Sequence, residues 1–283
     1  MDNNIAIVTD STSDLTADKI ENTLIYCIPL NVIFDDQTQF KDRVEITPKQ
    51  VYDNLDEKTP TTSMPSPQQF KEKYNKLKEK GYDKIISIHL SSNLSGTYNT
   101  AKTVSQLFDD IQIEVIDSRN TSMAMGRLVL YTNQLIKKGY KFTDVITKVK
   151  ENIKNINFYV VIETLKYLKR GGRIGKIAGT VGEILNIKPI VSINKKGELY
   201  TYDKNRGRSK SIKKLIKLVN QEINDDLYNV DVMHTNSRED AQKVLNKIKG
   251  INNINHRSVG ELGPVIGVHT GPGLIGVCIS KFN

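Results

Sequence analysis

The segment from Leu90 to Tyr98 carries five hydroxyl groups within nine residues, between a strand-like run and a helix-like run. The preceding residues, 83–89, have the apolar and β-branched character of a buried strand, and the following ones place apolar side chains at helical spacing. A helix N-terminus carries unpaired N–H groups and partial positive charge. The hydroxyls around Ser95 are therefore suited to holding an anion.

Helix capping is the alternative explanation of this segment, because Ser and Thr are ordinary N-cap residues. Two further segments favour a ligand site. Residues 61–67, with the sequence TTSMPSP, again place hydroxyls before a helix-like run. Residues 267–273, GVHTGPG, combine His269 with glycines that permit close backbone approach. Three such turns predict a shared binding site.

The residue pattern supports catalysis less well. The 4 histidines form no H-x-x-x-H pair and have no carboxylate partner at metal spacing, so we expect no metal site. A serine hydrolase acting on acyl esters, with Ser95, His269 and an aspartate such as Asp10, is the alternative function. The strained G-x-S-x-G elbow of many hydrolases is absent. The glycines at 171, 172 and 175 lack phosphate-loop spacing and predict a tight turn.

Five motifs, in this order along the chain, resemble those of the DegV family of bacterial fatty-acid-binding proteins. They are TDSTSD at 9–14, TSMPS at 62–66, LSSNLSGTY at 90–98, LKRGGRI at 168–174 and HTGPG at 269–273. Some members of this family serve as the acyl-carrying subunit of a fatty acid kinase. The resemblance therefore implies a lipid-binding subunit without a catalytic residue, metal or cofactor of its own.

Residue by residue, the resemblance implies a binding site for a long-chain fatty acid. Thr62 and Ser95 match positions that hydrogen-bond the carboxylate, and His269 matches a nearby donor. We include Ser63 and Ser91, from the same two loops, among the lipid-binding candidates. Hydroxyl donors can bind a carboxylate without a fixed buried cation beside it. The acyl tail requires an apolar slot.

Arg173, in the family's G-G-R turn, is the residue that the resemblance assigns to docking an ATP-dependent kinase subunit. An arginine that braces a domain turn is the alternative role. Two positions depart from frequent family residues. Asn93 stands where glycine is also common, and asparagine tolerates a left-handed backbone. Met64 replaces a frequent glutamine and can contact or shape one end of the ligand.

Length and composition agree with a two-domain protein in the cytoplasm. The chain has 283 residues, more than one domain usually holds. It contains no apolar run long enough to span a membrane, and its first residues lack the pattern of a signal peptide. The 2 cysteines, Cys27 and Cys278, each lie in an apolar strand-like run, which predicts buried thiols rather than a disulfide.

Charge is distributed unevenly along the chain. Residues 1–157 hold 20 basic and 21 acidic side chains, whereas residues 158–283 hold 21 and 11. Such a basic half can meet nucleic acid, anionic lipid or an acidic protein surface. The lysines of residues 210–217 instead fit the solvated face of an amphipathic helix. We expect no nucleic-acid binding, because aromatic stacking residues are missing, and transient contact with a membrane surface stays open.

The first half alternates strand-like and helix-like runs. This alternation predicts a doubly wound, mostly parallel sheet covered on both faces, with ligand loops at the carboxyl ends of the strands. The expected strands are 5–9, 24–34, 84–90 and 113–117, and the expected helices are 16–22, 47–57, 68–80, 95–108 and 121–138.

The second half predicts a mixed or antiparallel sheet with helices on one face. Residues 189–193 and 198–202 form a hairpin pattern with Gly197 in the loop. A helix at 209–224, a strand at 230–234, a helix ending at Ile248 and an apolar run at 274–279 follow. We place the domain boundary at 157/158. The class is α/β, with the ligand site at the junction of the two domains.

Overall fold

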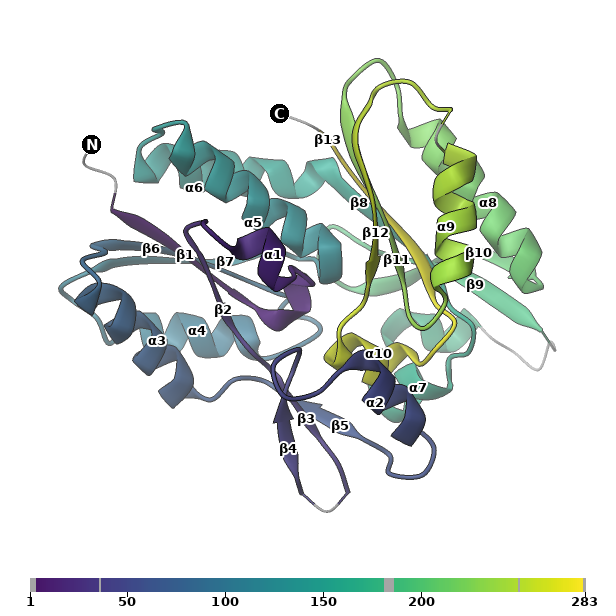
Figure 1. Cartoon of the computed structure of the whole chain (residues 1–283), viewed down its shortest axis with the longest axis horizontal. Coiled ribbons are helices and arrows are strands. Elements are labelled where there is room, and N and C mark those ends of the chain that lie inside the picture. Colours follow the sequence, from purple (N-terminus) through teal and green to yellow (C-terminus); the bar gives the residue numbers. More distant parts are fainter. Residues whose placement is uncertain (1–3, 36, 181–185, 249, 282–283) are drawn as a thin grey trace.

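The computed structural model describes residues 4–35, 37–180, 186–248 and 250–281. Its strands form three sheets, of four, six and three strands. Helices cover the outer faces of the two larger sheets and also separate these sheets from each other (Figure 1). The α/β class expected from the sequence is confirmed.

The four-stranded sheet is parallel, as expected for the first half of the chain. Its strands, in spatial order, are β2 (Ile25–Ile28), β1 (Ile5–Asp10), β6 (Lys84–His89) and β7 (Gln112–Asp117). Helices α3 (Pro67–Glu79) and α4 (Thr97–Ser105) cover one face, and α5 (Ser122–Lys137) and α6 (Phe142–Asn152) cover the other. Successive residues of β1 are therefore buried on opposite faces, which explains its continuous apolar run.

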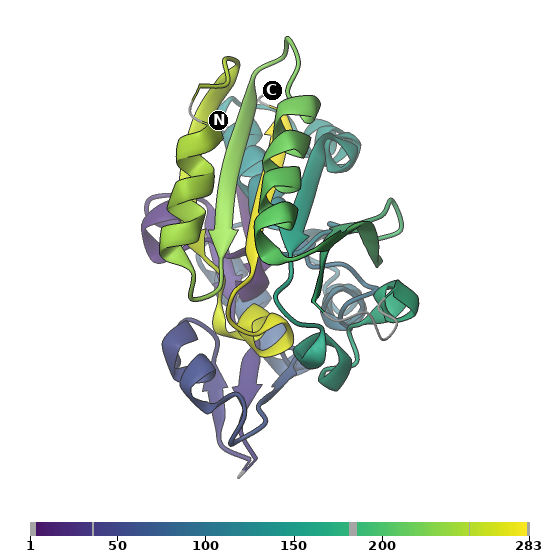
Figure 2. The same ribbon diagram turned by 90° about the vertical axis from the view of Figure 1, so that its right-hand side faces the viewer.

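The six-stranded sheet is mixed, because β11 and β12 are parallel and the other neighbours are antiparallel. Its spatial order is β10 (Leu199–Arg206), β9 (Ile187–Ile193), β8 (Ile156–Val161), β13 (Ile275–Lys281), β11 (Tyr228–His234) and β12 (Ile254–Glu261). Helices α8 (Arg208–Glu222) and α9 (Arg238–Ile248) lie over its outer face (Figure 2). The two helices of the second half thus lie on one face, as expected, and α5 from the first half packs on the inner face.

A three-stranded sheet joins the two halves of the molecule. It contains β4 (Gln39–Lys41), β3 (Asn31–Ile33) and β5 (Thr61–Ser63). Its core is shared with α2 (Pro48–Asn54), α7 (Lys166–Arg170) and α10 (Pro264–Thr270). The expected single strand 24–34 is wrong, because the chain leaves β2 at Pro29, which has no N–H to donate, and enters β3 in another sheet.

The remaining elements are short. They are α1 (Ala17–Ile20) and the 3-10 turns η1 (Ser11–Ser13), η2 (Ile153–Asn155) and η3 (Gly175–Thr180). The expected helix 95–108 begins later, at Thr97, because residues 91–95 form a turn in which the carbonyl of Ser91 accepts hydrogen bonds from Leu94 and Ser95. No helix in the described part of the chain combines the length and the apolar character that a membrane span requires.

A buried ion pair connects the two larger layers. Arg127 of α5 donates from Nη2 to Oδ1 of Asp231 in β11 at 2.6 Å, and its Nε donates to Oδ2. The Asp231 side chain is fully buried. Because this carboxylate has lost its hydration, it depends on the guanidinium for compensation. This ion pair and α5 join the two parts of the chain closely. The division at 157/158 stays a proposal.

Removing the arginine should destabilise the fold strongly. Arg127→Met should lower the free energy of unfolding by about 3 kcal/mol or more, because the buried carboxylate of Asp231 would keep its hydrogen bond from Ser258 but lose its compensating charge. Lys49→Ala, which removes an exposed ion pair with Asp53, should cost less than about 0.5 kcal/mol. Urea unfolding at neutral pH measures both. Equal losses in the two variants would contradict the structural role of the buried pair.

Candidate functional site

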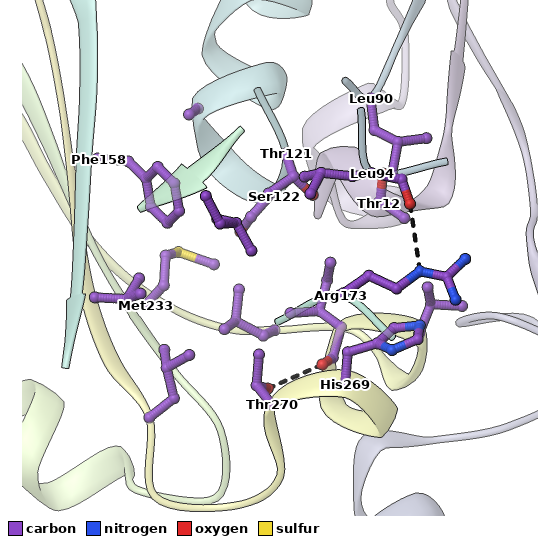
Figure 3. A pocket seen from close by; sticks show the side chains of 18 of the residues that line it. Thr12, Leu90, Leu94, Thr121, Ser122, Phe158, Arg173, Met233, His269 and Thr270 are labelled. Atoms are coloured by element: carbon purple, nitrogen blue, oxygen red, sulfur yellow. Dashed lines mark hydrogen bonds between the residues drawn. The ribbon is translucent and has the colours of Figure 1, made fainter. Parts of the chain in front are cut away.

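An apolar cavity lies between the inner face of the six-stranded sheet, the start of α5, and helix α10 (Figure 3). Its volume is about 120 Å³, counted over the positions that the centre of a water molecule can occupy. The lining is predominantly apolar. The inner wall is formed by Phe158, Val160, Ile162, Val191, Met233, Gly276 and Cys278.

The sheet leaves room for this cavity at one strand pair. Gly276 of β13 lies opposite Val160 of β8, and a Cβ on Gly276 would overlap the Val160 side chain. In β8, Phe158 and Val160 belong to the inner core, whereas Tyr159 and Val161 belong to the outer core. The pleat of β8 therefore turns alternate apolar side chains toward the cavity.

The polar groups of the cavity gather at one end. Thr62 comes from β5, Ser95 from the turn before α4, His269 from α10 and Arg173 from the turn after α7. In Figure 3, Arg173 and His269 lie beside each other, across the cavity from Phe158 and Met233. The sequence-predicted residues Thr62, Ser95 and His269 thus converge, although they are far apart in the chain.

His269 is held in its neutral form. Its Nε2 lies 2.8 Å from Oγ1 of Thr62, and its buried Nδ1 has no hydrogen-bond partner among the described residues. Burial, together with the nearby charges of Arg173 and Arg170, lowers the pKa of His269 to about 4. A Cβ on Gly171 would overlap Nδ1, so the glycine of the G-G-R turn makes room for the ring.

The hydroxyl of Ser95 has its hydrogen-bond neighbours on Thr97. Its Oγ lies 2.9 Å from Oγ1 of Thr97 and accepts from the Thr97 N–H at 3.3 Å. The turn that carries Ser95 is anchored by the buried Asp10, whose Oδ2 accepts from the N–H of Leu90 at 3.1 Å and lies 3.0 Å from Nδ1 of His89. The TDSTSD motif therefore contributes to the site by positioning this turn.

Arg173 lines the polar end of the cavity rather than standing apart from it. Its Nη1 donates to the carbonyl of Gly171 at 2.7 Å, and its Nε donates to the carbonyl of Leu94 at 3.4 Å. It makes no ion pair with a described carboxylate. The guanidinium is exposed and lies next to His269, so the polar end has a cation beside its hydroxyls but no buried one.

The other two hydroxyl candidates differ from each other. Ser63 lines the cavity, and its Oγ accepts from Nδ2 of Asn31 at 3.2 Å. Ser91 is placed outside the lining, and its Oγ donates to the carbonyl of Gly197 at 2.7 Å. Ser91 thus fixes the tip of the β9–β10 hairpin on the turn that carries Ser95.

The geometry does not assemble the hydrolase constellation. The hydrogen-bond neighbours of Ser95 are on Thr97, whereas the imidazole of His269 contacts Thr62. Asp10 contacts His89, not His269. Within residues 4–35, 37–180, 186–248 and 250–281, no group of three His, Cys, Asp or Glu side chains could hold a metal ion.

Comparison with known proteins gives the relationship of the whole chain. A family model described as "Uncharacterised protein, DegV family" matches residues 4–281. A DegV domain-containing protein of Clostridium acetobutylicum is 43% identical over 277 residues, covering 98% of this chain and 99% of its relative. The chain belongs to the DegV family.

Two solved DegV structures share the fold. One, from Thermus thermophilus, is 30% identical with a TM-score of 0.92, and the match covers 98% of this chain and 99% of that one. The other, from Bacillus subtilis, is 31% identical with a TM-score of 0.90 and the same coverage, 98% and 99%. The first is described as showing fatty acid binding, and the second as a fatty acid binding protein.

Sequence reasoning missed most of the cavity wall of this DegV chain. Residues 158–162 form a continuous apolar run, FYVVI, and only the structure shows that every second residue faces the cavity. Met233 and Gly276 carried no such signal, since their place depends on strand order. Met64, expected to shape one end of the ligand site, does line the cavity, and it is 44% exposed.

The lowered pKa of His269 predicts a pH dependence of stability. The unfolded chain gains a proton on this residue below about pH 6.5, whereas the folded protein gains it near pH 4, so stability is lost as the pH falls between these values. We expect a loss on the order of 2 kcal/mol, because the ring keeps some solvent contact.

His269→Gln removes the titrating ring and should reduce this loss. Urea unfolding of the lipid-free protein at pH 7.5 and 4.5 measures the effect, and comparison of the two proteins cancels the other titrating groups. If wild type and variant lose the same free energy between these pH values, the neutral buried state of His269 is refuted.

Proposed function

We propose that this protein binds a long-chain fatty acid, with the carboxylate at the Thr62, Ser95 and His269 end and the tail in the apolar cavity. The contact between Thr62 Oγ1 and His269 Nε2, at the mouth of that cavity, carries the proposal. The relatives from Thermus thermophilus and Bacillus subtilis, described as fatty-acid-binding, support it.

The tautomer of the neutral His269 ring determines how Thr62 can act. When the neutral ring carries its proton on Nε2, it donates to Oγ1 of Thr62, and the hydroxyl proton of Thr62 is free to donate to a carboxylate oxygen. Thr97 supports Ser95 in the same way, since its N–H donates to Ser95 Oγ. Two hydroxyls thus offer protons to one carboxylate.

Arg173 adds the charge that these neutral donors lack. Its guanidinium is fixed by the carbonyls of Gly171 and Leu94, and it has no described carboxylate partner. An anion bound between Thr62 and Ser95 would therefore experience its positive field. Hydrogen bonds to a charged group typically contribute about 1.5–3 kcal/mol, so the polar end orients the ligand.

The acyl tail supplies most of the binding free energy in this proposal. Burying about 14 methylene groups at roughly 0.8 kcal/mol each gives a gross gain on the order of 11 kcal/mol, which association and chain ordering reduce. Phe158 and Met233, across the cavity from the polar end, are placed to limit the length of the tail.

We further propose that the bound acid is presented, in the cytoplasm, to an ATP-dependent kinase subunit. A carboxylate oxygen would attack the γ-phosphorus of ATP, the bond from that phosphorus to the bridging oxygen would break, and acyl phosphate and ADP would form. This chain would contribute the acid and Arg173, and the partner would contribute ATP and its metal. The position of Arg173 beside the carboxylate end supports this arrangement.

Removing the two hydroxyls should weaken fatty acid binding. Thr62→Val and Ser95→Ala should each raise the Kd for oleate about tenfold or more, because each loses a hydrogen bond to a charged group. Ser105→Ala, on the exposed side of α4, is the control and should not change it. Titration of delipidated protein measures the Kd, and unchanged values in both cavity variants would refute the assignment.

Mass spectrometry of the denatured protein, purified from bacteria, tests the class of function. Free fatty acid released from the chain is expected for a carrier. An acyl group attached covalently to Ser95 would support the serine hydrolase instead and would overturn the proposal.

Arg173 should matter more to the kinase reaction than to tail binding. Arg173→Ala should lower the rate of acyl-phosphate formation at limiting protein by at least tenfold, while the Kd for oleate changes less than tenfold. Arg206→Ala, at an exposed position of β10, serves as the charge-matched control. A wild-type rate with Arg173→Ala would show that this residue does not serve the partner.

A further inference from the structure

Strand β7 forms one edge of the four-stranded sheet and pairs on one side only, with β6. The N–H of Gln112 donates to the carbonyl of Asp83, and the N–H of Ser118 donates to that of His89. These donors are six positions apart, so with the period-2 geometry of a strand the even-numbered residues face β6. The N–H and C=O groups of Ile113, Val115 and Asp117 therefore point away from the sheet.

These outward groups open into a groove that is separate from the fatty acid cavity. The groove is lined by β7, by α4, by the end of α6 with η2, and by the turn after β9, and no residue lines both it and the cavity. Its volume, counted like that of the cavity, is about 910 Å³. This space accommodates an extended segment, which lies about 4.8 Å from the strand it joins.

The walls of the groove carry unbalanced positive charge. Lys102, Lys154 and Lys195 line it and form no ion pair with the carboxylates of the described residues. Of the acidic side chains in the groove, Glu114 is paired with Lys150 at 2.6 Å, whereas Glu151 makes no ion pair with a described residue. The five basic side chains of the lining still outnumber its three acidic ones. Asp117 accepts from Ser92 Oγ at 2.6 Å and from the Arg119 N–H. The three free lysines thus favour an acidic occupant.

We propose that this groove binds an acidic, extended segment of a protein partner, which adds to β7 as a further strand. Its backbone would pair with Ile113, Val115 and Asp117, and its acidic side chains would meet Lys154 and Lys195. A second copy of this chain is disfavoured, because it would bring the same positive groove and a net charge of +9 against it.

The side chains of β7 specify the pattern of the segment. Ile113 and Val115 face the core beneath α3 and α4, whereas Glu114 faces α6 and its lysines. A strand paired with β7 therefore places apolar residues over the first face and acidic residues toward Lys150 and Lys154. Strict alternation of Glu and Val meets this requirement.

A fluorescein-labelled, N-acetylated peptide of four Glu-Val repeats is the probe, followed by fluorescence anisotropy. We expect it to bind the wild-type protein, and the double variant Lys154→Glu with Lys195→Glu to weaken binding at least tenfold. Lys71→Glu with Lys76→Glu, on helix α3, which does not line the groove, makes the same change in net charge and should leave binding intact. If both double variants weaken peptide binding equally, the effect comes from overall charge and the proposed binding site in the groove is refuted.

The backbone requirement is tested separately. Val115→Pro removes an N–H that faces the groove and spares the bonds to β6, so it should weaken peptide binding at least tenfold relative to Val115→Ala. Hydrogen exchange should show new protection of Ile113 and Val115 amides when the peptide is added. Absence of this protection, or dimerisation of the wild-type protein through β7, would refute the proposal.

Both variants should keep the wild-type Kd for oleate, because the groove and the cavity share no lining residue. An unchanged oleate Kd also shows that Val115→Pro is folded. If the peptide does not bind, only the proposed peptide site in the groove is refuted. If oleate does not bind the wild-type protein, only the proposed fatty acid binding is refuted.

Discussion

The polar end of the cavity depends on one uncharged imidazole held between Thr62 and Gly171. The ring stays neutral because it is buried next to two arginines, and its Nε2–H tautomer leaves the threonine hydroxyl proton for a ligand. This contact requires three separate pieces of chain, namely β5, α10 and the turn after α7, to meet at one point. The three-stranded sheet and the core that it shares with α7 and α10 hold these three segments together.

The layered architecture explains why the cavity is apolar along its length. Helix α5 lies between the two larger sheets, and its first turn closes the cavity against the inner face of β8 and β13. A site between two layers inherits the apolar side chains that each layer turns inward. Polar groups enter only where loops end, so head group and tail are separated by the fold itself.

Local patterns predicted the elements that depend on local physics. The strands of the parallel sheet, the β9–β10 hairpin and the convergence of Thr62, Ser95 and His269 all follow from periodicity, turn residues or motif resemblance. The elements and residues that the sequence analysis placed wrongly depend on tertiary contacts. Pro29 divides an apolar run between two sheets, Ser91 is taken by the carbonyl of Gly197, and α5 covers a sheet from the other half of the chain. The depth of the cavity depends on strand order, which no local pattern records.

The position of β13 has a consequence for the timing of folding. It is a central strand of the six-stranded sheet, between β8 and β11, yet it follows every other strand along the chain. During synthesis, the parallel sheet with its covering helices can form while β8 and β11 still lack the strand that joins them. Because α10 and His269 immediately precede β13, the nascent chain acquires its ligand site and its last sheet contacts together. Binding at this site would thereby be restricted to chains in which β13 has already been made.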